Sequence, residues 1–164
     1  MLKKFCAGLI IPLFFLSGCG LFQIQTDDLN HITISISMKK NGIYEKYIYY
    51  PQIDFLEKYS IEYNGEFYGS DKIGNWNLPK ETCCEIDTLI CKINTITMHT
   101  LEDPSVLFES DFIIIIEHTE IDGNMSENYN ESLPLYLTGT GEMPTVFQEI
   151  YDLFQKVSAE SMEQ

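Results

Sequence analysis

The segment that decides the fold runs from His31 to Tyr50 and reads HITISISMKKNGIYEKYIYY. Its first part alternates isoleucine with threonine or serine, a period of two that gives a strand one apolar face. Asn41-Gly42 is typical of a two-residue hairpin turn, and an apolar, tyrosine-rich run resumes at Ile43. The segment therefore predicts two antiparallel strands joined by a tight turn.

Further along the chain, the same signs of strands and turns return. Tyr59 to Tyr68 carries Asn64-Gly65 between short apolar runs and predicts a second hairpin. The segment 71–82 holds glycine, asparagine and proline, so we expect a loop there, with Trp76 as an anchor for packing or for a partner. Leu89 to Met98 alternates imperfectly and predicts another strand.

The last third of the chain changes its period. Phe112 to Ile116 is apolar at every position, which is typical of a central strand covered on both faces. Leu133 to Thr138 predicts a last strand, and apolar residues recur every three or four positions from Thr145 to Val157, as in an amphipathic helix. We expect a mainly β fold of about seven strands with one C-terminal amphipathic helix, either a single β-sandwich or an α+β sheet.

Composition limits the possible partners. The chain has 164 residues, of which 45% are hydrophobic, and this suffices for one domain with a core. The formal net charge is −15, and all ten basic residues are lysines. Nucleic-acid binders need basic faces to neutralise phosphates, so this balance argues against nucleic acid as a partner. It argues equally against a protein that lies flat on anionic lipid.

The first twenty residues have the pattern of a targeting segment. Two lysines near the start precede an apolar run, and residues 16–19 read Leu-Ser-Gly-Cys. The run is too short for a membrane-spanning helix, which needs about 20 apolar residues. Residues 16–19 resemble the lipobox that ends the type II signal peptide of bacterial lipoproteins. This resemblance implies cleavage after Gly18 and attachment of diacylglyceryl and a further acyl chain, such as palmitate, to Cys19.

The resemblance also divides the chain into three parts: a signal peptide at 1–18, a lipidated tether at 19–30 and a single globular β-rich domain at 31–160. Loss of the signal peptide removes two lysines, so the mature net charge is 8 − 25 = −17. Acyl chains alone would then hold the protein on its membrane. Gram-negative lipoproteins with Asp after the lipidated cysteine stay in the inner membrane. Gly20 stands there instead, so we expect the outer membrane, with the domain facing the periplasm.

Three cysteines lie in the expected domain, at Cys83, Cys84 and Cys91. The oxidising cell envelope permits a disulfide, and a bridge from Cys91 to either of the other two would close a loop of about eight residues. Neighbouring residues on a strand point to opposite faces, so only one of the pair can suit Cys91. The spacing does not fit a zinc site.

The segment 120–131 carries four carboxylates in twelve residues, and we expect it to be an exposed contact for a basic partner. Its carboxylates are Glu120, Asp122, Glu127 and Glu131. Alternate Asp and Asn positions suggest a calcium loop, but the glycine and the final glutamate of such a loop are not in place, so no metal is expected. Trp76 is the second candidate for partner binding.

No nucleophile or metalloprotease motif accompanies these residues, so we expect neither an enzyme nor a cofactor. In its build, with a lipobox, a strand-rich body and no enzyme motif, the chain looks like the periplasmic immunity lipoproteins encoded beside toxins of the type VI secretion system. That resemblance implies a membrane-anchored protein that binds and neutralises a secreted toxin. The alternative is a structural or adaptor lipoprotein of an envelope assembly.

Overall fold

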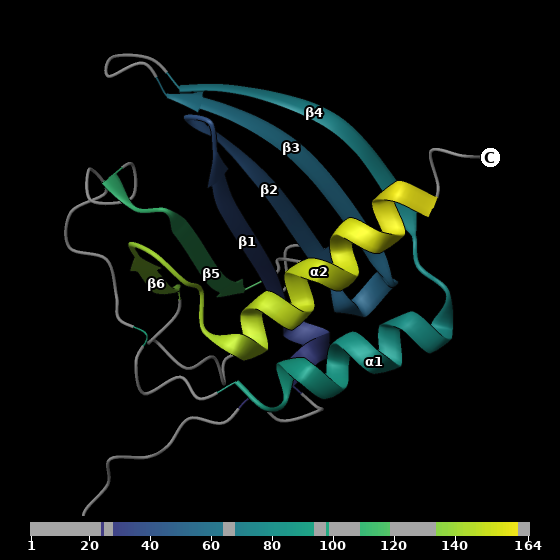
Figure 1. Ribbon diagram of the computed structural model, residues 1–164. Coiled ribbons are helices and arrows are strands. Elements are labelled where there is room, and N and C mark those ends of the chain that lie inside the picture. Colours follow the sequence, from purple (N-terminus) through teal and green to yellow (C-terminus); the bar gives the residue numbers. More distant parts are fainter. Residues whose placement is uncertain are drawn as a thin grey trace, which may run out of the picture.

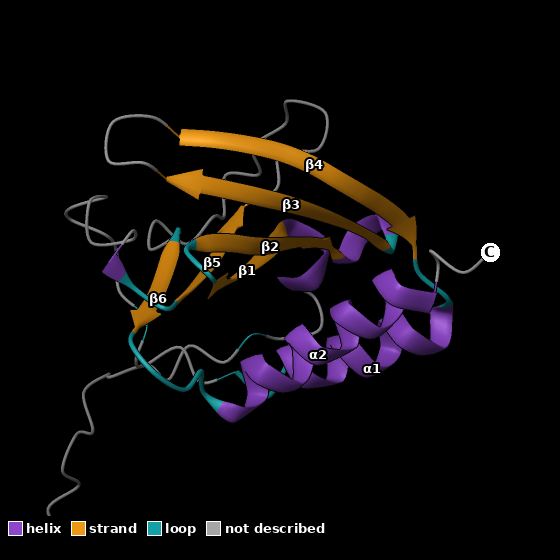
Figure 2. Cartoon of the chain, turned by 45° about the horizontal axis from the view of Figure 1, so that its top comes forward, coloured by secondary structure: helices purple, strands orange, loops and turns teal. Residues whose placement is uncertain are grey.

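The computed structural model describes residues 24, 28–63, 68–93, 98, 109–118 and 134–160. Six strands form one antiparallel sheet in the order β4-β3-β2-β1-β5-β6, and two α-helices lie side by side against one face of it (Figure 1, Figure 2). In chain order the elements are η1 (Asp28–His31), β1 (Ile32–Lys40), β2 (Ile43–Tyr50), η2 (Pro51–Ile53), β3 (Phe55–Tyr63), β4 (Tyr68–Asn77), α1 (Lys80–Ile90), β5 (Phe112–His118), β6 (Leu135–Gly139) and α2 (Thr145–Glu160). In this described part, no helix is long and apolar enough to cross a membrane.

The β1–β2 hairpin confirms the first prediction. Lys40 pairs with Ile43, and the turn residues Asn41 and Gly42 have φ angles of 54° and 85°. A two-residue turn that matches the twist of its strands needs positive φ at both positions, and asparagine and glycine adopt it at least cost. The second hairpin is also present, because β3 pairs antiparallel with β4.

The core lies between the sheet and the helices. On β1, Ile34 and Ile36 are 0% exposed. Phe154 of α2 is also fully buried, and its ring centroid lies 5.8 Å from that of Tyr47 and 5.9 Å from that of Tyr49 on β2. The apolar face of each element is thus buried against the other, which is what makes an amphipathic helix stable.

The C-terminal helix is confirmed, and it extends beyond its predicted end. It begins at Thr145, as expected, and runs to Glu160 rather than Val157. Its predicted apolar stripe faces the sheet, with Phe147 and Ile150 buried. The helix and the single sheet agree with the α+β alternative and not with the sandwich.

Strand β5 confirms the predicted apolar strand, but its place in the sheet is not central. It pairs with β1 on one side and β6 on the other, so it lies one strand from the edge. Ile114 and Ile116 point into the main core. Ile113 joins Tyr44 and Ile61 in a second, smaller cluster. Since neighbouring residues of a strand point to opposite faces, this buried residue on the other side explains the unbroken apolar run.

The loop predicted at 71–82 is wrong. Residues as far as Asn77 belong to β4, and α1 begins at Lys80, with Pro79 before it as the N-cap. An edge strand bonds to one neighbour only, and most of the described side chains of β4 are exposed, so glycine and asparagine are tolerated there. The strand predicted at 89–98 is wrong in its described part as well, because Leu89 and Ile90 end α1.

The folded core begins earlier than predicted. Ile24 is 2% exposed and Leu29 is 6% exposed, and both pack into the main core. Residues 28–31 form η1. Two residues of the expected tether at 19–30 therefore belong to the core of the domain. The lipobox and residues 1–23 lie outside the described residues.

Candidate functional site

The three cysteines lie at α1 and not on a strand. Cys83 is buried, Cys84 is exposed and Cys91 caps the C-terminus of the helix. A rise of about 1.5 Å per residue places the Cα atom of Cys91 about 12 Å from that of Cys83 and about 10.5 Å from that of Cys84, whereas a disulfide needs less than about 7 Å. The disulfide predicted for Cys91 is therefore wrong for this fold.

Trp76 is a packing residue of β4. It pairs with Leu56 of β3, and its half-buried indole packs against the main core. The ring also fills the space above Gly74, where a Cβ atom would come within 2.8 Å of Trp76 Cζ2. The four carboxylates predicted to contact a basic partner lie outside the described residues. They are Glu120, Asp122, Glu127 and Glu131.

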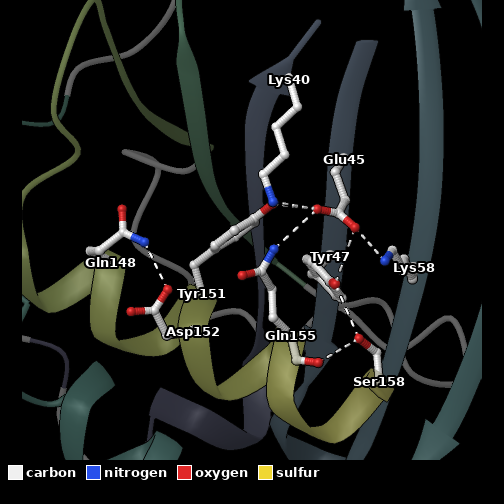
Figure 3. A network of polar contacts seen from close by, with 9 residues as sticks. All are labelled: Lys40, Glu45, Tyr47, Lys58, Gln148, Tyr151, Asp152, Gln155 and Ser158. Carbon is white, nitrogen blue, oxygen red and sulfur yellow. Dashed lines mark hydrogen bonds and ion pairs between the residues drawn. The ribbon is translucent and has the colours of Figure 1, made fainter. Parts of the chain in front are cut away.

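A carboxylate on β2 forms the densest polar cluster, which we name the Glu45 network (Figure 3). Glu45 Oε2 accepts hydrogen bonds from Lys40 Nζ at 2.9 Å, Tyr151 OH at 2.8 Å and Gln155 Nε2 at 3.2 Å. Lys58 pairs with the other oxygen, Oε1. The donors come from β1, β3 and α2, so one side chain ties three strands to the C-terminal helix.

These donors keep Glu45 ionised. Partial burial alone would raise the pKa of Glu45, but hydrogen bonds from Lys58, Lys40 and Tyr151 outweigh burial and lower the pKa to about 2. The hydrogen bond between Tyr151 and Glu45 also affects Tyr151. Burial, and then this bond, raise the pKa of Tyr151. A carboxylate with so low a pKa and so many donors is a poor proton acceptor at neutral pH. Its chemistry is that of a structural anchor.

Each lysine of the Glu45 network also lies over an aromatic ring. Lys40 Nζ is 5.4 Å from the ring centroid of Tyr151, and Lys58 Nζ is 5.2 Å from that of Tyr47. Such cation–π contacts hold the ammonium groups in place. The two lysines are therefore fixed beside the carboxylate, although Lys40 keeps half of its side chain exposed.

A hollow of about 360 Å³ opens beside Glu45. Two exposed apolar side chains lie at this hollow, Ile43 at 37% exposure and Ile73 at 51%. Among the described residues only one other large apolar side chain, Ile53, is as exposed. We name the hollow the Ile43–Ile73 pocket. Its lining consists of Lys40, Ile43, Glu45, Lys58, Tyr59, Ser60 and Ile73.

The arrangement suits contact with another molecule better than a reaction. The charged groups of the pocket already satisfy one another, and the accessible surface is apolar isoleucine with a partly exposed lysine beside it. Exposed apolar groups rimmed by polar ones are typical of protein-binding surfaces. In the described part of the chain, no group of three His, Cys, Asp or Glu side chains is placed to hold a metal ion.

The sequence contained one sign of this site that the prediction did not use. Every second side chain of β2 faces the helices. Glu45 belongs to this set and is its charged residue between Ile43 and Tyr47. A charge on an otherwise apolar strand face needs partners. The identity of those partners, on β3 and α2, is set by tertiary structure.

Comparison with known proteins gives no class for this fold and site. Models of protein families, curated proteins and solved structures were all searched, and none matches the chain.

Proposed function

We propose that this chain is a lipid-anchored protein of the bacterial cell envelope that acts by binding another protein through the Ile43–Ile73 pocket. The observation that carries the proposal is the pairing of exposed Ile43 and Ile73 at one hollow. Water-exposed isoleucine is costly, and a partner that covers both side chains recovers about 25 cal/mol for each Å² of apolar surface. The Glu45 network beneath them holds the strands rigid, which lowers the entropic cost of binding.

The membrane anchor rests on the lipobox at residues 16–19, with Cys19 as the acylated residue and the outer membrane as the site. A Cys19→Ser variant should lose labelling by a palmitate analogue and no longer sediment with membranes. Labelling at the wild-type level in that variant would remove the anchor from the proposal, while the binding surface would stand on its own evidence.

The charge of the mature chain, −17, favours a basic partner, because opposite charges speed encounter over long range. Within this proposal the partner is a secreted toxin, and the protein is its immunity factor. The four carboxylates of segment 120–131 are the part of the chain that we expect to attract such a partner. An adaptor of an envelope assembly is the alternative, and the identity of the bound partner separates the two.

The test is co-purification of the tagged, lipid-anchored full chain from detergent-solubilised envelopes, with and without added secreted proteins. The variant Ile43→Ser/Ile73→Ser removes both exposed apolar groups. The matched control is Ile53→Ser, which alters an equally exposed isoleucine on η2, outside the pocket. We expect a specific partner that the double variant loses and the control retains.

The partner found decides between the two functions. A secreted toxin supports immunity, and components of an envelope machine support the adaptor. Equal recovery with wild type and the double variant would contradict the pocket as the contact surface.

A further inference from the structure

The two helices carry the same short sequence pattern on the surface they share. Residues 85–92 of the chain read EIDTLICK, and residues 149–156 read EIYDLFQK. Each is a glutamate and an isoleucine, then leucine at the fifth position and lysine at the eighth. The isoleucines, Ile86 and Ile150, are both 0% exposed and point into the core. The glutamate, leucine and lysine of the second copy share another face of α2, at positions i, i+4 and i+7. In the first copy Glu85 and Leu89 lie on α1, and Lys92 lies in the turn that follows it.

These two faces meet in a groove on the outer side of the helix layer, with a volume of about 560 Å³. The helices lie side by side and run in opposite directions (Figure 1). The groove therefore has approximate two-fold symmetry: Glu85 lies at the same end as Lys156, and Glu149 lies at the same end as Lys92. The lining residues are Glu85, Thr88, Leu89, Lys92, Glu149, Asp152, Leu153 and Lys156.

The charges form an alternating square around an apolar centre. On α2, Glu149 and Lys156 are seven residues apart, or about 10.5 Å along the axis. Lys92 lies in the turn that follows α1 and lines the same groove. The four corners thus read negative, positive, negative, positive around Leu153, which is partly exposed, and Leu89, which is 8% exposed. A basic helix would meet both lysines of such a square, and an acidic one would meet both glutamates. When a second copy of this groove faces the first across a two-fold axis, every negative corner of one copy meets a positive corner of the other.

We propose that the α1–α2 groove is a self-association surface, and that its occupant is the same groove of a second copy of this chain. With the two-fold axis along the groove, α1 of each copy faces α2 of the other. Glu85 then meets Lys156 of the second copy, and Lys92 meets Glu149 of the second copy. Symmetry makes four ion pairs around four leucines, in the isologous form that most homodimers adopt.

The residues at the middle of the groove select the direction of the axis. An axis along the groove places Asp152 opposite Thr88 of the second copy, which carries no charge, because the Thr88 hydroxyl already donates to the Cys84 carbonyl. An axis across the groove gives the same four ion pairs in number but places Asp152 against its own symmetry mate, and two carboxylates repel. The along-groove arrangement is therefore the one proposed.

The dimer is a weak one. Helices of 11 and 16 residues offer a face of about 20 Å by about 20 Å, or about 400 Å² per copy, half of what a standard interface buries on each partner. Tethering of both copies to one membrane, which rests on the proposed anchor, raises their effective concentration. The surface is separate from the Ile43–Ile73 pocket, so this inference stands or fails independently of the proposed protein binding.

The test reverses one sign at a time. The mass of the full chain in non-ionic detergent is measured by light scattering, with the micelle contribution subtracted, from about 1 μM to about 1 mM, the range of weak interfaces. Glu85→Lys/Glu149→Lys makes the square entirely positive, and Lys92→Glu/Lys156→Glu makes it entirely negative. We expect each variant alone to be monomeric, and an equimolar mixture of the two to form a heterodimer.

A change in net charge alone does not explain the expected loss of dimerisation. The all-positive variant has a net charge of −15 + 4 = −11, so general repulsion falls while dimerisation is expected to be lost. The matched control is Glu81→Lys/Glu160→Lys, which makes the same change of charge on the same helices but outside the groove lining. We expect the control to dimerise at least as well as wild type. All substituted side chains are exposed, and circular dichroism verifies that each variant folds.

A third variant tests the axis. Glu85→Lys/Lys156→Glu keeps the net charge and keeps the proposed pairing, because the exchanged partners still face each other. An axis across the groove would instead place the new lysine at position 85 against Lys92 of the second copy. Dimerisation of this variant supports the arrangement, and its loss overturns it. A monomeric wild type throughout the range, or a mixture of the sign variants that stays monomeric, overturns the proposal.

Discussion

Tyr151 of α2 donates a 2.8 Å hydrogen bond to Glu45 of β2 across the boundary between helix and sheet. The phenol is 1% exposed, whereas the carboxylate remains in partial contact with solvent. The bond is the buried end of a cluster whose other donors are nearer the surface. Removal of this bond therefore measures how much it contributes to the packing of α2 on the strands.

Replacement of Tyr151 by phenylalanine removes this bond and keeps the ring. Hydrogen bonds to charged groups are worth about 1.5–3 kcal/mol, and the remaining donors on Glu45 reduce the loss, so we expect the free energy of unfolding to fall by about 1–2 kcal/mol. Urea denaturation measures this as a lower midpoint with unchanged slope. As a control, Tyr136→Phe alters a half-buried tyrosine of β6 outside the network. An unchanged midpoint for Tyr151→Phe would contradict the importance of the bond.

The same network predicts a dependence of stability on pH. The pKa of Glu45 is lowered from 4.5 to about 2 in the folded protein. The unfolded state therefore binds a proton at higher pH than the folded state does, so the contribution of Glu45 is fully present above pH 4.5 and is lost as pH falls toward 2. Glu57, whose pKa is lowered by Lys72, Tyr59 and Tyr50 against the effect of burial, adds in the same direction.

The measurement is urea unfolding between pH 6 and about pH 2.5, for wild type and for Glu45→Gln. Glutamine cannot titrate, so the variant should start less stable at pH 6 and lose less on acidification. The difference between the two proteins should narrow steadily below pH 4.5. Parallel curves would show that Glu45 does not titrate with a lowered pKa.

A glycine on the edge strand allows a sharp test of the packing of Trp76. A Cβ atom at Gly74 would lie 2.8 Å from Trp76 Cζ2, so Gly74→Ala forces the indole to move. Overpacking of this kind costs about 1–3 kcal/mol. Gly69→Ala is the matched control on the same strand, since its nearest atom would be 4.0 Å away. Trp76 is the only tryptophan in the chain, so its fluorescence should shift in the first variant and not in the second.

The elements that the sequence predicted well are those fixed by local chemistry. Asn41-Gly42 determines a turn by itself, and the apolar positions of α2 repeat over four turns. The segment before α1 is rich in glycine and asparagine and therefore resembles a loop in sequence, although it is the edge strand β4, which pairs with β3. Cys83, Ile86 and Leu89 have helical spacing, but three positions are too few to predict a helix. The neighbouring cysteines Cys83 and Cys84 instead favoured the prediction of a strand and a disulfide.

The candidate surfaces depended on contacts that the sequence does not show. Glu45 and Tyr151 are 106 positions apart, and only the packing of α2 on β2 brings them together. Ile43 and Ile73 share a hollow because β3 lies between their strands. The repeated pattern in α1 and α2 is eight residues long, with four identities, and it acquires meaning only when the two helices are antiparallel neighbours.

Truncation of a fully buried aromatic side chain of α2 tests how much the helix contributes to the fold. Phe154 is 0% exposed and lies between the rings of Tyr47 and Tyr49. Phe154→Ala removes most of this contact, and a cavity of that size costs about 3–5 kcal/mol. Val157→Ala, at a half-buried position one turn later, should cost less. Equal and small changes in melting temperature would show that α2 is peripheral.

The thiols of α1 test the helix itself, because a strand and a helix expose them differently. Burial, and then the hydrogen bond and charge of Asp54, raise the pKa of the Cys83 thiol from 9 to about 12. Thiolate is the reactive form, so at pH 8 this shift lowers the reactive fraction about 1,000-fold, in addition to the effect of burial. We expect maleimide to label exposed Cys84 at once in the native protein and Cys83 only after unfolding, as resolved by mass spectrometry of peptides.

Mild oxidation before labelling should leave both thiols reactive, since α1 holds Cys83 and Cys91 too far apart to bridge. Recovery of a peptide that joins Cys91 to Cys83 or Cys84 would show that this stretch is not the helix described above.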